Sequence, residues 1–359
     1  MSEPPSRAEL THYRGRPRAP AKALDALRVV GTTLLWMMAA AVRRALGRRR
    51  RAGWSFGLEL TIAAYRGSWS VLPKIGILRW RNVGEALSTL RWNGLQPEFV
   101  QFASAAQPMG GVWLEPPEAD GPVMLYFHGG GFVFASLRTH GALIAALARA
   151  ARARSLAIEY RLAPEHPAPA ALQDALLAYR QLLAQGIPAR RIVLAGDSAG
   201  GTLVLETLLA LRDAGEPLPA AGVAICPWVD LGGSGASFQS NADFDFVGDV
   251  HCRLAATSYA ADISTTSTEI SPCYADLTGL PPLLVQAGAL EVLLDQIREF
   301  VGKARAAGVD VTCSVYEDMV HVWHMMAAAA PQSLEAIAEV GAFISRHARE
   351  RPLPHSTPK

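Results

Sequence analysis

The chain has 359 residues, of which 50% are hydrophobic and 18% are charged, and its formal net charge is +2. This length and composition are typical of one large α/β domain with additions, and we find no internal repeat of the kind that indicates a solenoid. The four cysteines have no close-paired spacing, which argues against a zinc site and predicts reduced thiols; they are Cys226, Cys252, Cys273 and Cys313.

The first sixty residues carry an excess of positive charge, with a net charge of +8 against −6 for the remainder. Their uncharged run Val29–Val42 is flanked by Arg28, Arg43, Arg44 and the cluster Arg48–Arg51. A simple transmembrane helix needs about twenty apolar residues, so the run is short for a span, whereas a helix on an anionic membrane surface fits the arginines. The long charged leader argues against a cleaved signal peptide, and one charge run without a recognisable module gives little support for nucleic-acid binding.

Downstream of the basic segment, predicted helices give way to alternating strands and helices. Leu60–Ile77 and Val83–Leu90 are predicted helices. From residue 123 onward, strand-like and helix-like stretches alternate, which is typical of a mostly parallel sheet with helices on both faces. The predicted strands are Val123–Phe127, Leu156–Tyr160, Ile192–Ala195, Gly222–Cys226, Pro282–Gly288 and Val311–Tyr316, and the predicted helices between them are Ala171–Gln185 and Thr202–Ala214.

The first chemically informative motif is His128-Gly129-Gly130-Gly131-Phe132, directly after a predicted strand. Three successive glycines leave room for a substrate beside the main chain, and the pattern fits the oxyanion-hole loop of lipases and esterases. We predict the N–H groups of Gly130 and Gly131 as oxyanion donors, with His128 ordering the loop. A merely flexible glycine loop is the alternative.

A second glycine motif, Gly196-Asp197-Ser198-Ala199-Gly200-Gly201, follows the predicted strand that ends at residue 195. The order strand, G-x-S-x-G, helix is typical of a nucleophile elbow, in which glycines permit a sharp turn and the serine hydroxyl projects at the end of a sheet. Ser198 is therefore the predicted nucleophile. Ala199 is the predicted third oxyanion donor, and Asp197 is a supporting residue of the motif.

The remaining catalytic partners are expected nearer the C-terminus, because an α/β-hydrolase carries its acid after the nucleophile and its histidine last. Glu291 and Asp295 both follow one late predicted strand, and His321 and His324 both follow the next. In such a set the histidine takes the proton of the serine, and the acid orients the imidazole. The Gly-, Ser- and Asp-rich segment 232–270 is predicted to be an insertion of loops and short helices beside the site.

Taken in order, these motifs resemble the bacterial hormone-sensitive-lipase-like group of α/β-hydrolases. The resemblance implies a carboxylesterase core under an N-terminal helical cap, without a metal or an organic cofactor. It implies Glu291 as the acid and His321 as the base, with Asp295 starting or capping the next helix. Besides the two glycine motifs, the matching segments are Tyr160–Pro167, Pro227–Leu231, Ser271–Pro272 and Leu280–Pro282.

We therefore expect an α/β-hydrolase in three parts: a basic helical cap or membrane-associating segment over 1–92, the catalytic domain over 93–350 and a tail over 351–359. The expected reaction is hydrolysis of short- to medium-chain acyl esters through an acyl-enzyme on Ser198. An amidase or peptidase with the same triad, or a non-catalytic receptor on the same fold, is the alternative. The expected partner is a small acyl ester and not nucleic acid. The expected location is cytoplasmic, with peripheral membrane association and a homodimer left open.

Overall fold

The computed structural model describes residues 21–88, 91–102, 109–119 and 121–348 of the chain. Its core is an eight-stranded sheet in the order β1-β2-β4-β3-β5-β6-β7-β8. The pairs β1/β2 and β2/β4 are antiparallel and all the others are parallel, which confirms the predicted fold class. The strands are β1 (Pro97–Phe102), β2 (Met109–Leu114), β3 (Val123–Phe127), β4 (Arg154–Ile158), β5 (Ile192–Asp197), β6 (Ala221–Ile225), β7 (Leu283–Gly288) and β8 (Val311–Tyr316).

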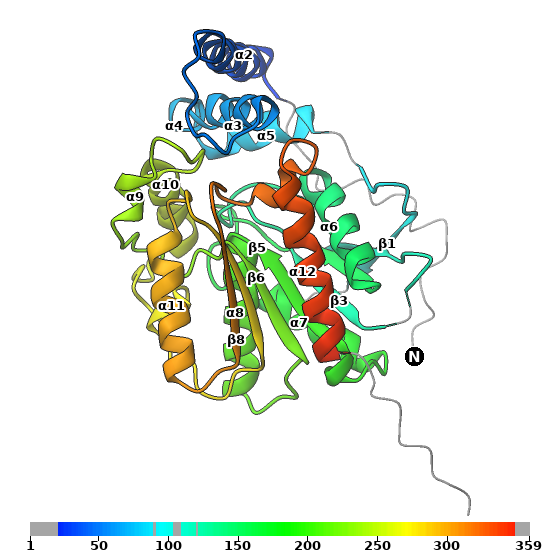
Figure 1. Cartoon of the computed structure of the whole chain (residues 1–359). Helices are drawn as coiled ribbons and strands as arrows, with labels where there is room; N and C mark the ends of the chain where they lie inside the picture. Colours follow the sequence, from blue (N-terminus) through cyan, green and yellow to red (C-terminus); the bar gives the residue numbers. More distant parts are fainter. Residues whose placement is uncertain (1–20, 89–90, 103–108, 120, 349–359) are drawn as a thin grey trace, which may run out of the picture.

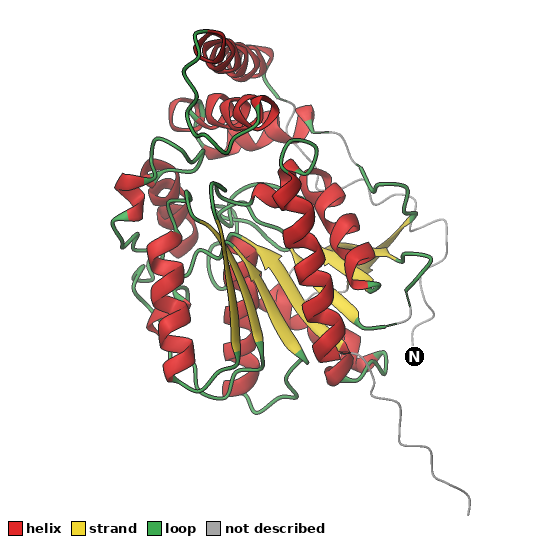
Figure 2. Cartoon of the chain, in the orientation of Figure 1, coloured by secondary structure: helices red, strands yellow, loops and turns green. Residues whose placement is uncertain are grey.

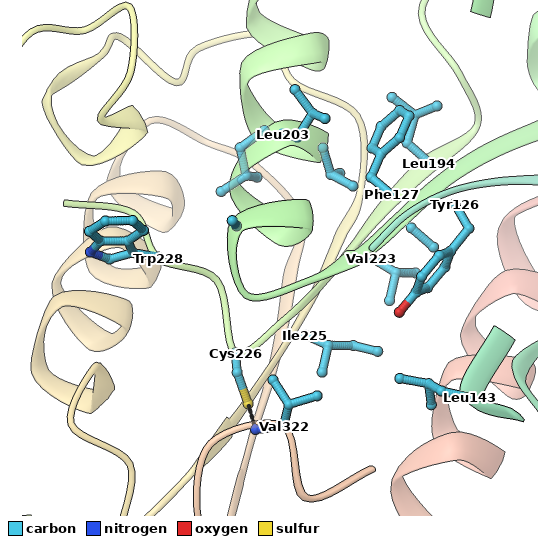
Figure 3. Packing of buried hydrophobic residues seen from close by; sticks show 14 of the residues in the cluster. Tyr126, Phe127, Leu143, Leu194, Leu203, Val223, Ile225, Cys226, Trp228 and Val322 are labelled. Atoms are coloured by element: carbon cyan, nitrogen blue, oxygen red, sulfur yellow. Dashed lines mark hydrogen bonds between the residues drawn. The ribbon is translucent and has the colours of Figure 1, made fainter. Parts of the chain in front are cut away.

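Helices cover both faces of the sheet (Figure 2), so the central strands β3, β5 and β6 are buried along their whole length. On one face α6 packs against α12, and on the other α7 packs against α8 (Figure 1). Figure 3 shows this layering at close range, with Leu203 of α8 on one side of the strands and Leu143 of α6 on the other. The helices are α6 (Leu137–Ala151), α7 (Ala170–Ala184), α8 (Ala199–Asp213), α11 (Leu294–Ala306) and α12 (Pro331–Ala348).

The N-terminal helices form a further layer above this core (Figure 1). The prediction of one helix over Leu60–Ile77 is wrong, because the chain turns after Trp69 and again at Gly76, whose φ of 80° lies in the left-handed region that favours glycine. Ser55 begins the first of the resulting helices, since its side chain accepts the N–H of Leu58. The N-terminal helices are α2 (Ala23–Ala45), α3 (Phe56–Trp69), α4 (Leu72–Ile75) and α5 (Ile77–Leu87).

The outermost of these helices, α2, is longer than its uncharged run. With 23 residues it is long and apolar enough to cross a membrane. Only 17% of its most apolar stretch is buried against the rest of the protein. Its inner side packs closely on α3, because a Cβ at Gly67 would come within 2.7 Å of Thr33 Cα. Val29 and Ala40 are buried on this side. The helix therefore has one face against the protein and one exposed apolar face.

Part of the basic cluster binds the chain itself. Arg51 forms an ion pair of 2.7 Å with Asp318, and Arg50 donates to the backbone carbonyl of Asp243. Arg50 and Arg51 therefore also hold the N-terminal segment against the rest of the chain. Asp318 lies on the loop after β8, so Arg51 ties the N-terminal helices to the segment that carries the candidate histidine.

Between β6 and β7 the chain forms loops and the helices α9 (Ser237–Ser240) and α10 (Asp249–Ala260). In Figure 1 both helices lie near the N-terminal layer. The predicted tail 351–359 lies outside the described residues.

Candidate active site

Ser198 lies at a strained turn between β5 and α8. Its φ of 54° and ψ of −122° turn the chain from strand to helix in one step, and the flanking glycines make this turn possible. A Cβ at Gly196 would come within 2.4 Å of Gly200 O, and one at Gly200 within 2.0 Å of Phe127 O. Close packing of the helix against the neighbouring strands therefore excludes any side chain at these two positions.

The structure brings Ser198, His321 and Glu291 together from three separate segments. His321 Nε2 lies 2.9 Å from Ser198 Oγ, and His321 Nδ1 lies 2.7 Å from Glu291 Oε2. The other carboxylate oxygen of Glu291 accepts the N–H of Gly288 at 2.8 Å, which fixes the orientation of this buried side chain. The three groups form a continuous line of hydrogen bonds from a carboxylate to a hydroxyl.

The two alternative candidates lie elsewhere. Asp295 is in the first turn of α11, where its Oδ2 accepts the N–H of Ser237, the first residue of α9, at 2.8 Å. His324 Nε2 lies 2.8 Å from Oε1 of Gln286 on β7. Burial lowers the pKa of His324 to about 3, so this imidazole is neutral at ordinary pH. Neither side chain contributes to the line of hydrogen bonds at Ser198.

The surroundings of His321 favour its protonated form. Burial by itself lowers the pKa of His321, but the hydrogen bond and the charge of Glu291, together with the charge of Asp245, outweigh burial and leave this pKa raised. The pair with Glu291 therefore stabilises the imidazolium that forms when the histidine takes a proton.

The glycine loop after β3 presents free backbone donors beside the serine. Gly130 has a φ of 113°, and a Cβ there would come within 2.2 Å of Phe134 O, so the loop requires glycine at this position. Its carbonyl accepts the N–H groups of Val133 and Phe134, which closes a tight turn. In the described part of the chain, the N–H groups of Gly130, Gly131 and Ala199 donate to no other group. Gly130, Gly131 and Ser198 line one cavity, so the two glycine donors lie beside the space that a substrate carbonyl would occupy, and Ala199 directly follows the serine.

Asp197 fixes the glycine loop to the elbow. Its Oδ1 accepts the Gly129 N–H at 3.0 Å and the Tyr126 hydroxyl at 2.6 Å, and its Oδ2 lies 3.3 Å from His140 Nε2. Burial raises the pKa of Asp197, but the charge and hydrogen bond of His140 offset burial and the pKa is lowered overall. This buried carboxylate is therefore charged while it holds the loop.

His128 lies beneath the same loop. Its ring stacks on Tyr160 with 4.4 Å between the ring centroids, and its Nδ1 lies 2.7 Å from the carbonyl of Gly129. The Tyr160 hydroxyl in turn donates to the His128 carbonyl at 2.6 Å. These contacts support the predicted role of His128 in ordering the loop.

Asp245 was missed by the sequence analysis. This buried carboxylate follows α9 and accepts three backbone N–H groups, from Phe246 at 2.8 Å, from Val292 at 2.9 Å and from His321 at 3.3 Å. It thus joins the loop of the candidate acid to the loop of the candidate histidine. Burial, only partly offset by the charge of His321, raises the pKa of Asp245 to about 6. Tyr126 and His140 were missed in the same way.

The serine is one of the residues that line a cavity of about 400 Å³. The N-terminal helices supply much of its wall, and most of the lining is apolar. Trp69 makes edge-on contacts with Phe134 and Phe246, at centroid distances of 4.9 and 5.5 Å, and Trp80 adjoins it at 5.1 Å. The cavity therefore combines one line of reactive polar groups with an aromatic wall, which is the usual composition of a small-molecule site.

Cys226, Glu291 and His321 place their ligand atoms within 4.8 Å of one another and could hold a metal ion by position. The chemistry of the donors does not fit one. Both ring nitrogens of His321 are engaged in hydrogen bonds, to Glu291 and to Ser198, and burial with the charge of Glu291 raises the pKa of the metal-free Cys226 thiol well above its usual range. The sulphur instead accepts the N–H of Val322 at 3.4 Å (Figure 3). The absence of a metal cofactor stays a prediction.

Comparison with known proteins places the chain in a family. A family model described as the alpha/beta hydrolase fold matches residues 124–325. An acetyl-hydrolase of Streptomyces hygroscopicus is 46% identical over 233 residues, which is 65% of this chain and 78% of that protein. Crystal structures of a mutant of the esterase E40 and of an esterase from the bacterial hormone-sensitive lipase family are 41% and 38% identical, with TM-scores of 0.76 and 0.68. The matches cover 82% and 91% of this chain and 99% of each of those chains. The chain belongs to the α/β-hydrolase family and, within it, to the bacterial hormone-sensitive-lipase group.

Proposed function

We propose that the protein is a serine carboxylic-ester hydrolase in which Ser198, His321 and Glu291 form the catalytic triad. The observation that carries this proposal is the line of hydrogen bonds of 2.9 and 2.7 Å that joins the three side chains at the cavity. A receptor on the same fold would not need this line, so the hydrolase is the better supported of the two.

In this mechanism Ser198 Oγ adds to the ester carbonyl while His321 Nε2 takes the hydroxyl proton. The N–H groups of Gly130, Gly131 and Ala199 stabilise the negative oxygen that results, and each such donor contributes about 2.7–4 kcal/mol. The bond to the alkoxy oxygen then breaks, and the imidazolium protonates the departing alcohol. Water next attacks the acyl-enzyme with His321 as base, which releases the acid and restores Ser198.

The cavity supports a small ester of short to medium acyl length. Its aromatic wall offers apolar surface to an acyl chain, while the free N–H donors lie beside the serine. An amide would use the same groups, so amidase or peptidase activity is the second candidate.

The experiment that tests the proposal measures kcat/KM of the full chain on p-nitrophenyl esters of increasing acyl length and on the matching anilides. We expect ester hydrolysis to exceed anilide hydrolysis and Ser198→Ala to abolish it. Anilides cleaved faster than esters would favour the amidase, and wild-type turnover by Ser198→Ala would overturn the mechanism.

We also infer a cytoplasmic enzyme that associates peripherally with a membrane through α2. The support is a stripe of exposed apolar side chains on the outer face of this helix, among them Leu27, Leu35 and Met38 with exposed fractions of 71%, 63% and 57%. A homodimer through the same face is the competing occupant. Flotation of the full chain with liposomes tests the inference: the paired variant Leu34→Glu/Leu35→Glu should stay with the soluble fraction, and equal partitioning of both proteins would contradict it.

A further inference from the structure

A second cavity, of about 330 Å³, lies between α2 and α3. Three arginines line it: Arg43 from α2, Arg50 from the following loop and Arg66 from α3. Trp36 closes one side, with the Arg66 guanidinium 5.2 Å from its ring centroid. None of the proposed catalytic residues lines this cavity.

The three guanidinium groups share one small space and repel one another. Burial lowers the pKa of Arg50 and of Arg66, and the charge of a neighbouring arginine lowers each of them further. The charges of Glu59 and Asp243 offset part of this repulsion at Arg50, and those of Asp243 and Asp245 do so at Arg66. A bound anion would offset more of it. The site therefore has a built-in preference for negative charge.

One carboxylate, Glu59, also lines this cavity, and its Oε2 is buried without a hydrogen-bond partner in the described part of the chain. Glu59 Oε1 accepts the backbone N–H of Arg50 at 2.8 Å and lies 3.6 Å from an Arg44 nitrogen. Asp243 and Asp245 contribute charge from outside the cavity, and Arg66 contacts their backbone carbonyls rather than their carboxylates. Arg43 forms no ion pair within the described residues. Its Nε and that of Arg66 are buried there without a hydrogen-bond partner.

The cavity adjoins the exposed apolar stripe of α2. Leu35, Ala39 and Arg43 line both the cavity and a shallow groove on the outer face of the helix. The stripe recurs at intervals of one helical turn, as expected for a helix that lies on a membrane. Its exposed members are Leu24, Leu27, Val30, Leu34, Leu35, Met38, Val42 and Leu46. In Figure 1, α2 is the outermost layer, so the stripe faces away from the core.

We propose that Arg43, Arg50 and Arg66 form a binding site for the phosphate headgroup of an anionic phospholipid, with α2 lying in the bilayer surface. The proposal rests on the membrane association inferred above and names its lipid partner. Guanidinium groups bind phosphate through paired, charge-assisted hydrogen bonds, and a planar fork suits a buried site better than an ammonium does. The apolar stripe then contacts acyl chains while the headgroup occupies the cavity beside it.

This arrangement also places the membrane next to the catalytic centre. Val29, on the inner side of α2, lines the cavity that contains Ser198. Helix α2 thus separates the bilayer from the active-site cavity, and an ester dissolved in the membrane surface would meet the enzyme at this side.

The test is flotation of the full chain with vesicles of phosphatidylcholine alone and of phosphatidylcholine with phosphatidylglycerol. Arg43→Gln should bind the anionic vesicles at least tenfold more weakly. The matched control Arg49→Gln, an exposed arginine outside the cavity, should lose only the roughly fivefold expected for one surface charge. Unchanged hydrolysis of a soluble ester by Arg43→Gln shows that the variant is folded.

The outcomes separate the headgroup site from membrane association itself. Equal losses of vesicle binding by Arg43→Gln and Arg49→Gln would overturn the headgroup site, because only a diffuse attraction between the basic segment and the anionic membrane would then be needed. Full binding by Leu34→Glu/Leu35→Glu, or a dimer in solution that buries α2, would overturn association through this helix. Inorganic phosphate at constant ionic strength should displace the wild type from anionic vesicles and leave the residual binding of Arg43→Gln unchanged. Phosphate that binds the wild type without displacing it from the vesicles would overturn the headgroup site and reassign the cavity to a free anion.

Discussion

The Nδ1 atom of His321 lies 2.7 Å from Oε2 of Glu291, whereas the carboxylate of Asp295, four residues further on, accepts the N–H of Ser237, the first residue of α9. The two acidic residues follow the same strand, yet only one faces the imidazole. The structure therefore distinguishes two acidic side chains that the sequence alone could not: Glu291 orients the imidazole, and Asp295 holds the first residue of α9.

Glu291→Gln should lower kcat about 10⁴-fold, because an amide can hold the imidazole in the wrong tautomer and cannot stabilise its protonated form. The matched control is Asp295→Asn, which should keep kcat close to the wild-type value. Steady-state hydrolysis of p-nitrophenyl butyrate checks both variants. Equal losses for the two would contradict the assignment of the acid.

Asp245→Asn should move the acidic limb of the kcat/KM profile to lower pH. Hydrolysis requires neutral His321, and activity falls as pH decreases through the pKa of this imidazole. The charge of Asp245 raises that pKa, so removing the charge lowers it. Asp243→Asn, an exposed neighbour whose carboxylate does not contact His321, is the control and should leave the limb in place. If the acidic limb of the kcat/KM profile does not move in Asp245→Asn, the charge of Asp245 does not act on His321 and its role is purely structural.

Tyr126→Phe should destabilise the protein by about 1.5–3 kcal/mol, the usual contribution of a hydrogen bond to a charged group. The lost hydroxyl donates to Asp197 at 2.6 Å, and Asp197 holds the glycine loop through Gly129. Urea denaturation measures the loss, and kcat should fall with little change in KM because the oxyanion donors shift. A variant as stable and as active as wild type would contradict this account of the loop.

Trp69→Leu should shift the acyl-length preference toward longer chains. The indole forms part of the aromatic wall with Phe134 and Phe246, and a smaller side chain lengthens the cavity. Each further methylene that becomes buried adds about 0.8 kcal/mol, or about fourfold in kcat/KM. Leu78→Ala, an exposed change on α5, serves as control. The kcat/KM ratio of octanoate to acetate esters measures the shift, and an unchanged ratio would mean that the acyl chain binds elsewhere.

Much of the candidate site could be predicted from local sequence motifs. The glycines around Ser198 and the glycine loop signal their geometry within a few residues, because tight turns and close strand-to-helix packing need glycine wherever they occur. The parallel sheet was also predictable locally. Its central strands are buried on both faces, and each of them is therefore a nearly continuous apolar run in the sequence. The spacing of Glu291 and Asp295 could not separate them, because their orientation depends on a loop elsewhere in the chain.

The supporting residues had no local signal. Asp245 and Val292 are 47 positions apart, Tyr126 and Asp197 are 71 apart, and their contacts arise only when distant loops meet. The contacts of the basic cluster Arg48–Arg51 were equally unpredictable from local sequence. A charge run is visible in the sequence, but the ion pair of Arg51 with Asp318 spans 267 positions and turns part of that run inward.

The central claim is an acyl-enzyme on Ser198, and mass spectrometry of the intact protein and its peptides tests it most directly. The full chain is mixed with excess p-nitrophenyl acetate and quenched with acid within the first turnovers. We predict a burst of p-nitrophenol and a mass increase of one acetyl group, located on the peptide that contains Ser198 and missing from Ser198→Ala. An acetyl group on another residue, or turnover by Ser198→Ala at the wild-type rate, would contradict the account.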